Sequence, residues 1–186
     1  MRIIGGTLGG RVLRAPGGAT TRPTSEKVRE AVFDILGPIE GAHVLDLFAG
    51  TGALGLEAVS RGAAFALFVD DGAEARALIR GNVETLGLGG VTKIFRRDAT
   101  KLGPAHPIEP FGLVFADPPY GKALAEAALA SARDGGWLAP DALVVVEEAV
   151  DPGFAAPAGF EEDERRRYDE TELVFLRTGA QPLGSP

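Results

Sequence analysis

Asp117, Pro118, Pro119 and Tyr120 form the stretch of this sequence with the most specific chemistry. They follow the apolar segment 111–116, so they lie at the carboxyl end of an expected strand, where ligands collect in parallel α/β sheets. Prolines fix the backbone and lack an N–H, which leaves the Pro118 carbonyl able only to accept hydrogen bonds. Asp117 and this carbonyl are predicted to accept both hydrogens of an exocyclic amino group, with Tyr120 stacking on the base. A plain loop entering a helix would explain the prolines but not the flanking Asp and Tyr.

Three glycines at positions 50, 52 and 55 follow another apolar segment and precede a helical pattern. Their spacing permits a tight turn and close approach of a ligand to the backbone, and it also satisfies the dinucleotide fingerprint G-x-G-x-x-G. Asp46 argues against NAD, because a pyrophosphate would be repelled there. A carboxylate at this place suits a cationic group instead, such as the ammonium of a methionyl moiety. A glycine-rich turn without a ligand is the plainer alternative.

Two further acidic positions follow expected strands. Segment 65–71 ends in Asp70 and Asp71, and an acid at the end of the second strand of a doubly wound fold accepts hydrogen bonds from ribose hydroxyls. Both NAD and S-adenosylmethionine contain such a ribose, so Asp70 predicts a nucleoside site without choosing between them. Asp98, after the next expected strand, is predicted to contact the adenine amino group.

The elements that must position these residues alternate between strands and helices. Short apolar strands separated by helices indicate a parallel sheet that is covered on both faces. The last two segments, 159–169 and 170–178, are expected to form an antiparallel hairpin. The predicted strands before them are 42–48, 65–71, 91–99, 111–116 and 142–149, and the predicted helices are 54–62, 72–87 and 122–136.

The beginning of the chain has its own pattern. Residues 2–17 alternate apolar and polar residues around glycine pairs, as a short β-hairpin or a mobile arm would. An amphipathic helix follows, with Thr24 or Ser25 as the expected N-cap and Gly37 as its end. We therefore expect a basic arm or hairpin over residues 1–20, one domain over 21–178, and a disordered tail over 179–186.

Composition narrows the class of protein. The 186 residues are 45% hydrophobic and 24% charged, which is typical of a globular domain. No apolar run approaches the roughly 20 residues of a membrane-spanning helix, and the N-terminus has no secretory h-region, so a cytoplasmic protein is expected. The chain has no cysteine and two histidines, so neither a disulfide nor a metal site is expected.

The charge is unevenly distributed along the chain. Residues 1–30 carry six basic and two acidic groups, a net charge of +4, whereas residues 31–186 carry 13 basic and 24 acidic groups, a net charge of −11. A protein that binds a polyanion with an acidic body needs its positive charge concentrated in this way, although a solvated basic tail would give the same count. The candidate phosphate-binding residues are Arg2, Arg11, Arg14 and Arg22.

The motifs together resemble a known family. DLFAGTGALG followed by DPPY is similar to S-adenosylmethionine-dependent amino methyltransferases of the Rossmann-like class. The N-terminal RIIGG and GRVL, the segment RPTSEKVREAVFDIL and the segment LGLEAVSRGA resemble bacterial methyltransferases that modify guanine N2 in 16S ribosomal RNA. DPPY alone is shared with DNA adenine and protein glutamine methyltransferases, whereas the RPT…VRE segment is typical of a much smaller group of proteins.

This resemblance implies an α/β Rossmann-like fold with a seven-stranded, mostly parallel sheet, and S-adenosylmethionine as cofactor. It implies a monomeric enzyme that acts on 16S rRNA, usually at guanine 966, within the small ribosomal subunit or its assembly intermediate. The alternatives are DNA adenine-N6 methylation and a non-catalytic nucleotide-binding module. The residues expected at the site are Asp117, Pro118, Pro119 and Tyr120 for catalysis, and Thr24, Asp46, Phe48, Gly50, Gly52, Asp70 and Asp98 for the cofactor.

The sequence departs from the family pattern at two places. Gly72 stands where a second acid is usual after the second strand, so the ribose acid is kept as Asp70, and the second acid has either moved by one residue to Asp71 or been lost. Asp169 stands in the last turn where a glycine is usual, and Asp tolerates positive φ better than most residues.

Overall fold

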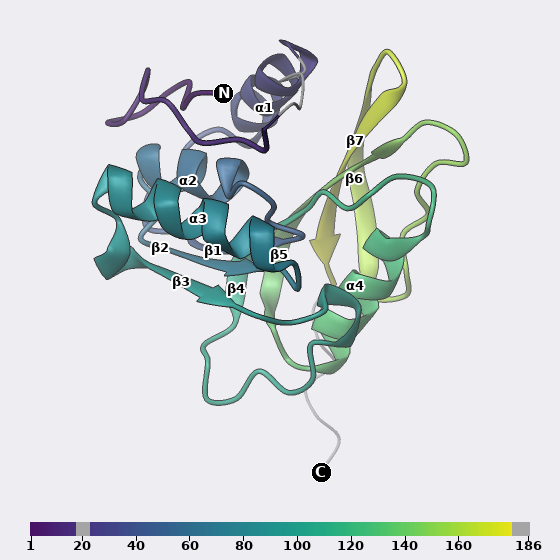
Figure 1. Cartoon of the computed structure of the whole chain (residues 1–186). Coiled ribbons are helices and arrows are strands. Elements are labelled where there is room, and N and C mark those ends of the chain that lie inside the picture. Colours follow the sequence, from purple (N-terminus) through teal and green to yellow (C-terminus); the bar gives the residue numbers. More distant parts are fainter. Residues whose placement is uncertain (18–22, 180–186) are drawn as a thin grey trace. The chain divides into compact units, whose positions relative to one another are not determined.

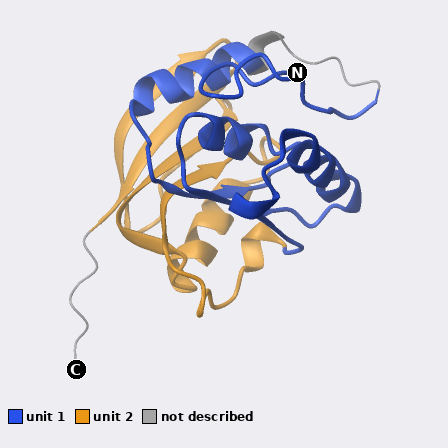
Figure 2. Cartoon of the chain, turned by 90° about the vertical axis from the view of Figure 1, so that its left-hand side faces the viewer, with its two compact units in different colours: residues 1–97 blue, residues 98–186 orange. Residues whose placement is uncertain are grey.

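A computed structural model describes residues 1–17 and 23–179 of the chain. It divides into two compact units, residues 1–97 and 98–186 (Figure 2). Each unit is described by itself below, with the element labels of Figure 1.

Three parallel strands form the sheet of the first unit, in the order β3-β2-β1. Strands β1 and β2 are apolar and largely buried, as expected for strands covered on both faces, whereas β3 buries Thr92 and exposes Lys93. Leu47 pairs with Val69, and Val69 with Phe95, so the three strands end level with one another. The loops that follow β1 and β2 therefore open side by side at one edge. The strands are β1 (His43–Leu47), β2 (Phe65–Val69) and β3 (Thr92–Phe95).

The helices of this unit are α1 (Pro23–Leu36), α2 (Ala53–Ser60) and α3 (Ala73–Leu86), and a short 3₁₀ turn, η1 (Gly89–Val91), precedes β3. Helix α2 packs against β1 and β2, and α3 against β3 (Figure 1).

Helix α1 begins at Pro23 and ends before Gly37, whose φ is 69°. The expected cap at Thr24 or Ser25 is wrong, because both residues lie inside the first turn. A proline suits the first position of a helix, where its missing N–H is not needed.

The N-terminal segment is packed onto the first unit. Arg2 and Val12 form an antiparallel bridge, as expected of a short hairpin, and the Ile3 N–H donates to the Arg11 carbonyl at 2.9 Å. Ile3 and Leu13 are buried, which a solvated tail would not show.

Glu57 of α2 holds this segment through a buried carboxylate. It accepts the Ile4 and Gly5 N–H groups, each at 3.0 Å, and pairs with Arg61 at 3.0 Å and with the buried Arg29 at 3.9 Å. A buried charge needs such partners, so residues 1–5 are part of the folded unit.

The second unit contains four strands in the order β4-β5-β7-β6. Strands β4 and β5 are parallel, β7 runs antiparallel to β5, and β6 and β7 form the expected C-terminal hairpin. Its turn contains Asp169 at a φ of 54°, so this aspartate does adopt the positive φ predicted for it. The elements are η2 (Ala99–Lys101), β4 (Phe111–Ala116), α4 (Leu124–Asp134), β5 (Leu138–Ala149), β6 (Phe160–Tyr168) and β7 (Thr171–Thr178).

The described residues thus contain the seven strands and the alternating helices of the expected α/β class. Strand β5 begins at Leu138, four residues before the predicted start. The sequence pattern does not reveal this first part of the strand, because it is irregular. Pro140 and Asp141, with a φ of 59°, interrupt the pattern there, and the pairing with β4 shifts register. Within the described residues, no helix has the length and apolar character to cross a membrane.

Candidate active site

The loop between β1 and α2 has an unusual backbone. Phe48, Gly50 and Gly52 have φ values of 56°, 59° and 80°, three left-handed residues within five positions. Glycine adopts this conformation without strain, but Phe48 does not. Backbone strain at a residue other than glycine is typical of ligand-binding loops. Gly52 also caps α2, whose N-terminus follows directly. The loop therefore places backbone that carries no side chain, at Gly50 and Gly52, at the start of a helix.

Gly55 has a packing role. A Cβ at this position would lie 2.5 Å from Cε1 of Phe68 on β2 and 3.1 Å from the Asp46 carboxylate. The absence of a side chain lets α2 approach the sheet closely, as the third glycine of a dinucleotide loop does.

Asp70, at the end of β2, fixes the glycine loop from outside it. Its Oδ2 accepts the Gly50 N–H at 3.0 Å, and its Oδ1 accepts the Gly72 N–H at 2.9 Å. Each carboxylate oxygen has a second acceptor position, so hydroxyl groups of a ligand can still bind it. A Cβ at Gly72 would lie 3.2 Å from Oδ1, so glycine here leaves room for the Asp70 carboxylate.

Asp46 lies beneath the same loop, almost completely buried. Its Oδ2 accepts the Gly55 N–H at 3.0 Å. Burial raises the pKa of Asp46 to about 8; the hydrogen bond from Gly55 opposes this shift, and the charge of Asp70 adds to it. The structure thus gives Asp46 a bond to the first turns of α2, and its contact with a ligand ammonium stays a prediction.

Asn82 of α3 is a buried polar residue that the sequence patterns do not single out. Its Oδ1 accepts the Arg14 N–H at 2.6 Å, and its Nδ2 donates to the carbonyls of Arg14 at 3.2 Å and Thr51 at 2.9 Å. Thr51 lies between the two glycines of the loop. Asn82 therefore ties the glycine loop to the N-terminal segment.

In the second unit, Asp117 to Tyr120 follow β4, as predicted. Pro118 is buried, Asp117 and Tyr120 are half-buried, and Pro119 is exposed. The Tyr120 hydroxyl donates to Glu147 Oε1 at 2.6 Å and lies 3.2 Å from Thr171 Oγ1. The phenol is thus tethered to β5 and β7, which fixes the position of its ring.

These surroundings keep the Tyr120 phenol protonated. Burial raises its pKa well above the usual range, and the carboxylate of Glu147 adds to the shift both by its charge and by accepting the hydroxyl proton. The protonated hydroxyl can therefore serve as the donor in the bond to Glu147.

Glu148 holds the other end of this loop. It is buried, and its Oε1 accepts the N–H groups of Gly121 at 3.0 Å and Ala149 at 2.9 Å. Sequence reasoning missed Glu147 and Glu148 as supports of the DPPY loop. An acidic pair at the end of an apolar strand, the feature used to select Asp70, could have indicated them.

Asp98 follows β3, at the start of the second unit. It is exposed, and its Oδ1 accepts both the N–H of Thr100 at 2.9 Å and its hydroxyl at 2.7 Å, which caps η2. These bonds lower the pKa of Asp98. Its carboxylate thus shapes a turn, and an adenine contact stays a prediction.

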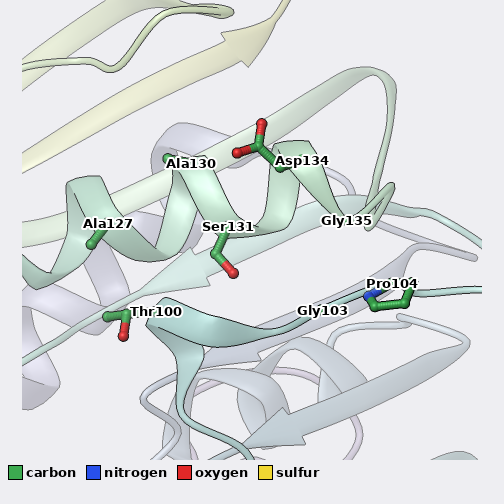
Figure 3. Close-up of a pocket in the computed structure, with 8 residues that line it drawn as sticks. All are labelled: Thr100, Gly103, Pro104, Ala127, Ala130, Ser131, Asp134 and Gly135. Carbon is green, nitrogen blue, oxygen red and sulfur yellow. The ribbon is translucent and has the colours of Figure 1, made fainter.

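A shallow hollow of about 540 Å³ lies beside this turn, between η2 and α4 (Figure 3). Its lining includes Thr100, Pro104, Ala127, Ala130 and Ser131 but none of the predicted site residues. Ser131 accepts the Leu102 N–H at 2.8 Å, which explains the one hydroxyl on α4 there.

Arg22, predicted to bind RNA, lies outside the described part of the chain, as does the side chain of Thr24, predicted for the cofactor site. The other predicted RNA-binding residues are described. Arg2 is exposed and pairs with Glu26 at 3.5 Å. The Arg11 guanidinium donates to the Thr85 carbonyl at 3.1 Å. Arg14 is exposed, with its backbone held by Asn82.

Comparisons with known proteins agree with this architecture. The chain is 43% identical over 156 residues to ribosomal RNA small subunit methyltransferase D of Escherichia coli, covering 83% of this chain and 77% of the relative. It is 33% identical to the Haemophilus influenzae methyltransferase of the same name, covering 84% and 83%. The solved structure of yhhF from Escherichia coli matches 97% of this chain and 99% of its own with a TM-score of 0.84 at 35% identity.

The strands, the glycine loop and these relatives define a methyltransferase with a Rossmann-like α/β fold. Residues 1–177 match the family described as conserved hypothetical protein 95. The chain belongs to this family, together with the small-subunit methyltransferases named above.

Proposed function

We propose that this chain transfers a methyl group from S-adenosylmethionine to the exocyclic N2 of a guanine in 16S rRNA, with guanine 966 as the expected target. The observation that carries the proposal is the tethered Asp117–Tyr120 loop, which presents acceptors and a fixed ring after β4. The rRNA methyltransferases among its relatives support the substrate class.

The residues around the glycine loop fit the cofactor. When bound, S-adenosylmethionine supplies an electrophilic methyl group on a sulfonium centre. Asp70 would accept hydrogen bonds from the ribose hydroxyls, and Gly50 and Gly52 would let the loop backbone approach the ligand. Asp46 would favour the ammonium, because a nearby cation stabilises the ionised form of a buried carboxyl.

Asp117 and the Pro118 carbonyl would orient the target base. The guanine amino nitrogen is a poor nucleophile, because its lone pair is delocalised into the ring. Two acceptors for its hydrogens would fix the amino group so that the lone pair faces the methyl group. Positioning of this kind contributes about 7 to 11 kcal/mol in well-oriented reactions, and the Asp117 charge would stabilise positive charge that develops on nitrogen.

Tyr120 would hold the base once it has left its stack. Unstacking costs a few kcal/mol, and stacking on an aromatic ring returns about 1 to 3 kcal/mol. Because the hydroxyl is bound to Glu147, the ring is already in place before the base arrives.

The proposed substrate is 16S rRNA within the small subunit or its assembly intermediate, in the cytoplasm, with a monomeric enzyme. The test is methyl transfer from labelled S-adenosylmethionine to small subunits of a strain that lacks this protein, with the modified nucleotide mapped. We expect one labelled guanine, methylated at N2. Label in DNA adenine, or binding of NAD in place of S-adenosylhomocysteine, would contradict the proposal.

A further inference from the structure

Arg14 lies against helix α3 at a position that glycine keeps open. Gly81 is buried in the middle of α3, and a Cβ there would lie 2.8 Å from Nη1 and 3.3 Å from Cδ of Arg14. Glycine inside a helix costs about 1 kcal/mol relative to alanine. Helix α3 therefore contains a destabilising residue at the place where the Arg14 side chain crosses it.

The backbone of Arg14 is fixed at the same place. Asn82, next to Gly81, both accepts the Arg14 N–H and donates to its carbonyl, and its second donor hydrogen bond holds Thr51 of the glycine loop. The Arg14 side chain thus starts from a defined point beside that loop, in contrast to an arginine on a mobile arm.

Two more arginines lie on or beside α3. Arg11 reaches the last turn of the helix through its bond to the Thr85 carbonyl. Arg80, adjacent to Gly81, is exposed and makes no hydrogen bond or ion pair within residues 1–17 and 23–179. We call Arg11, Arg14 and Arg80 the α3 arginine surface.

The charge of the two units favours a polyanion at this surface. Residues 1–97 carry 12 basic and 10 acidic groups, a net charge of +2, whereas residues 98–186 carry 7 and 16, a net charge of −9. Two of the three arginines of β6 are already in ion pairs, Arg165 with Glu162 and Glu172, and Arg166 with Glu164. The third, Arg167, donates to the Asp169 carbonyl at 3.1 Å. On α3 the exposed acids are Glu74 and Glu84, so positive charge still prevails around the α3 arginine surface.

A purely structural role explains only part of this arrangement. A cation beside the last carbonyls of a helix is stabilising, which accounts for Arg11. It does not account for the glycine that accommodates Arg14, nor for the exposed Arg80. Guanidinium groups bind phosphate oxygens through parallel N–H donors, so the arginines on and beside α3 suit this ligand.

We propose that the α3 arginine surface binds the phosphate backbone of the RNA substrate. The inference rests on the proposed function and adds Arg80 and the Gly81 position to the RNA contacts. Because Asn82 links Arg14 to the glycine loop, bound RNA would be held at a fixed place relative to the cofactor-binding loop of the same unit.

The test measures affinity for small ribosomal subunits, purified from a strain that lacks this protein, at several salt concentrations. Arg80→Glu and Arg14→Ala are each expected to weaken binding about fivefold to tenfold and to reduce the logarithmic salt slope by about 0.7 to 0.9. Lys93→Glu, an exposed charge reversal on β3, is the matched control and should leave the slope unchanged. S-adenosylhomocysteine affinity should stay within a few-fold in all three variants.

Gly81→Ala gives an independent test with opposite effects on stability and binding. Alanine improves the helix but displaces the end of the Arg14 side chain, so the melting temperature should hold or rise while RNA affinity falls. Two results would overturn the α3 arginine surface and leave the proposed function standing. The first is unchanged RNA affinity in both Arg80→Glu and Gly81→Ala. The second is an equal loss of RNA affinity in Arg80→Glu and in the control Lys93→Glu. Failure of the wild-type protein to bind or methylate these subunits would overturn the proposed function itself.

Discussion

Asp70 and Gly50 are 20 residues apart in sequence, yet the Asp70 carboxylate accepts the Gly50 N–H at 3.0 Å. The bond joins the loops that follow β1 and β2, which open side by side because the two strands end level. The same carboxylate is the proposed acceptor for ribose hydroxyls. Loop shape and ligand binding therefore depend on one side chain.

We predict that Asp70→Ala weakens S-adenosylhomocysteine affinity about tenfold to a hundredfold without changing which base is methylated. Hydrogen bonds to a charged group contribute about 1.5 to 3 kcal/mol, and the variant loses those to the ligand as well as those to Gly50 and Gly72. Titration calorimetry measures the loss. The neighbouring Asp71→Ala, an exposed acid, is the control and should bind normally. Equal affinities for both variants would remove Asp70 from the site.

Asp117→Ala is expected to abolish methyl transfer while S-adenosylhomocysteine affinity stays within a few-fold of wild type. Asp117 is placed by our proposal at the target amino group, so its loss affects the chemical step and not cofactor binding. Single-turnover methyl transfer and calorimetry on the same preparation separate the two effects. A folded Asp117→Ala protein that no longer binds S-adenosylhomocysteine would show that this carboxylate belongs to the cofactor site.

Tyr120→Phe and Tyr120→Ala should separate the hydroxyl from the ring. The Phe variant loses the bond to Glu147, so the free energy of unfolding should fall by about 1 to 3 kcal/mol, but its ring still stacks on the base. The Ala variant loses stacking as well, and its kcat/KM should fall about a further tenfold to a hundredfold. Denaturant unfolding and steady-state kinetics report the two losses. Equal kcat/KM values would argue against a stacking role.

Asp46 should make stability depend on pH. Its pKa of about 8 in the folded chain exceeds the value of about 3.9 in an unfolded one, so the folded state binds more protons between these values. Stability must then fall as pH rises from about 4 to about 8. Asp46→Asn keeps an oxygen acceptor for the Gly55 N–H but does not titrate. The unfolding free energy of wild type should therefore drop by a few kcal/mol relative to this variant between pH 5 and pH 9, measured in urea. A difference that is constant with pH would contradict the raised pKa.

The strands and the acids that follow them could be predicted because each is a local feature. An apolar run of four to eight residues indicates a buried strand, and the first polar residue after it lies at the edge of the sheet. This reasoning selects Asp70 and Asp117, and both do follow strands, β2 and β4. The cap of α1 was placed wrongly because Pro23 and Thr24 compete as start signals, and proline takes the first helical position.

The residues that support the site could not be found by the same means. Asn82 and Glu57 interrupt amphipathic helices and look like ordinary surface positions, but both are buried and bind backbone groups more than 50 residues away. Pairing at such separation has no periodicity in the sequence. Only the folded chain shows that the N-terminal segment completes these polar clusters.

This dependence gives the last prediction, which concerns removal of residues 1–17. The basic composition of this segment suggests a dispensable arm, but its deletion would leave the buried Glu57 carboxylate without the Ile4 and Gly5 donors and expose the pocket of Ile3. Leaving a buried group without its hydrogen-bond donors costs about 1 to 3 kcal/mol, so the midpoint of urea unfolding should fall. Glu57→Gln should destabilise the truncated chain further, because the carboxylate still pairs there with Arg61 and with the buried Arg29. In the full-length chain the same substitution should cost more, since the carboxylate also accepts from Ile4 and Gly5. A truncated protein as stable as wild type, or an equal cost of Glu57→Gln in both backgrounds, would show that the segment is an appendage after all.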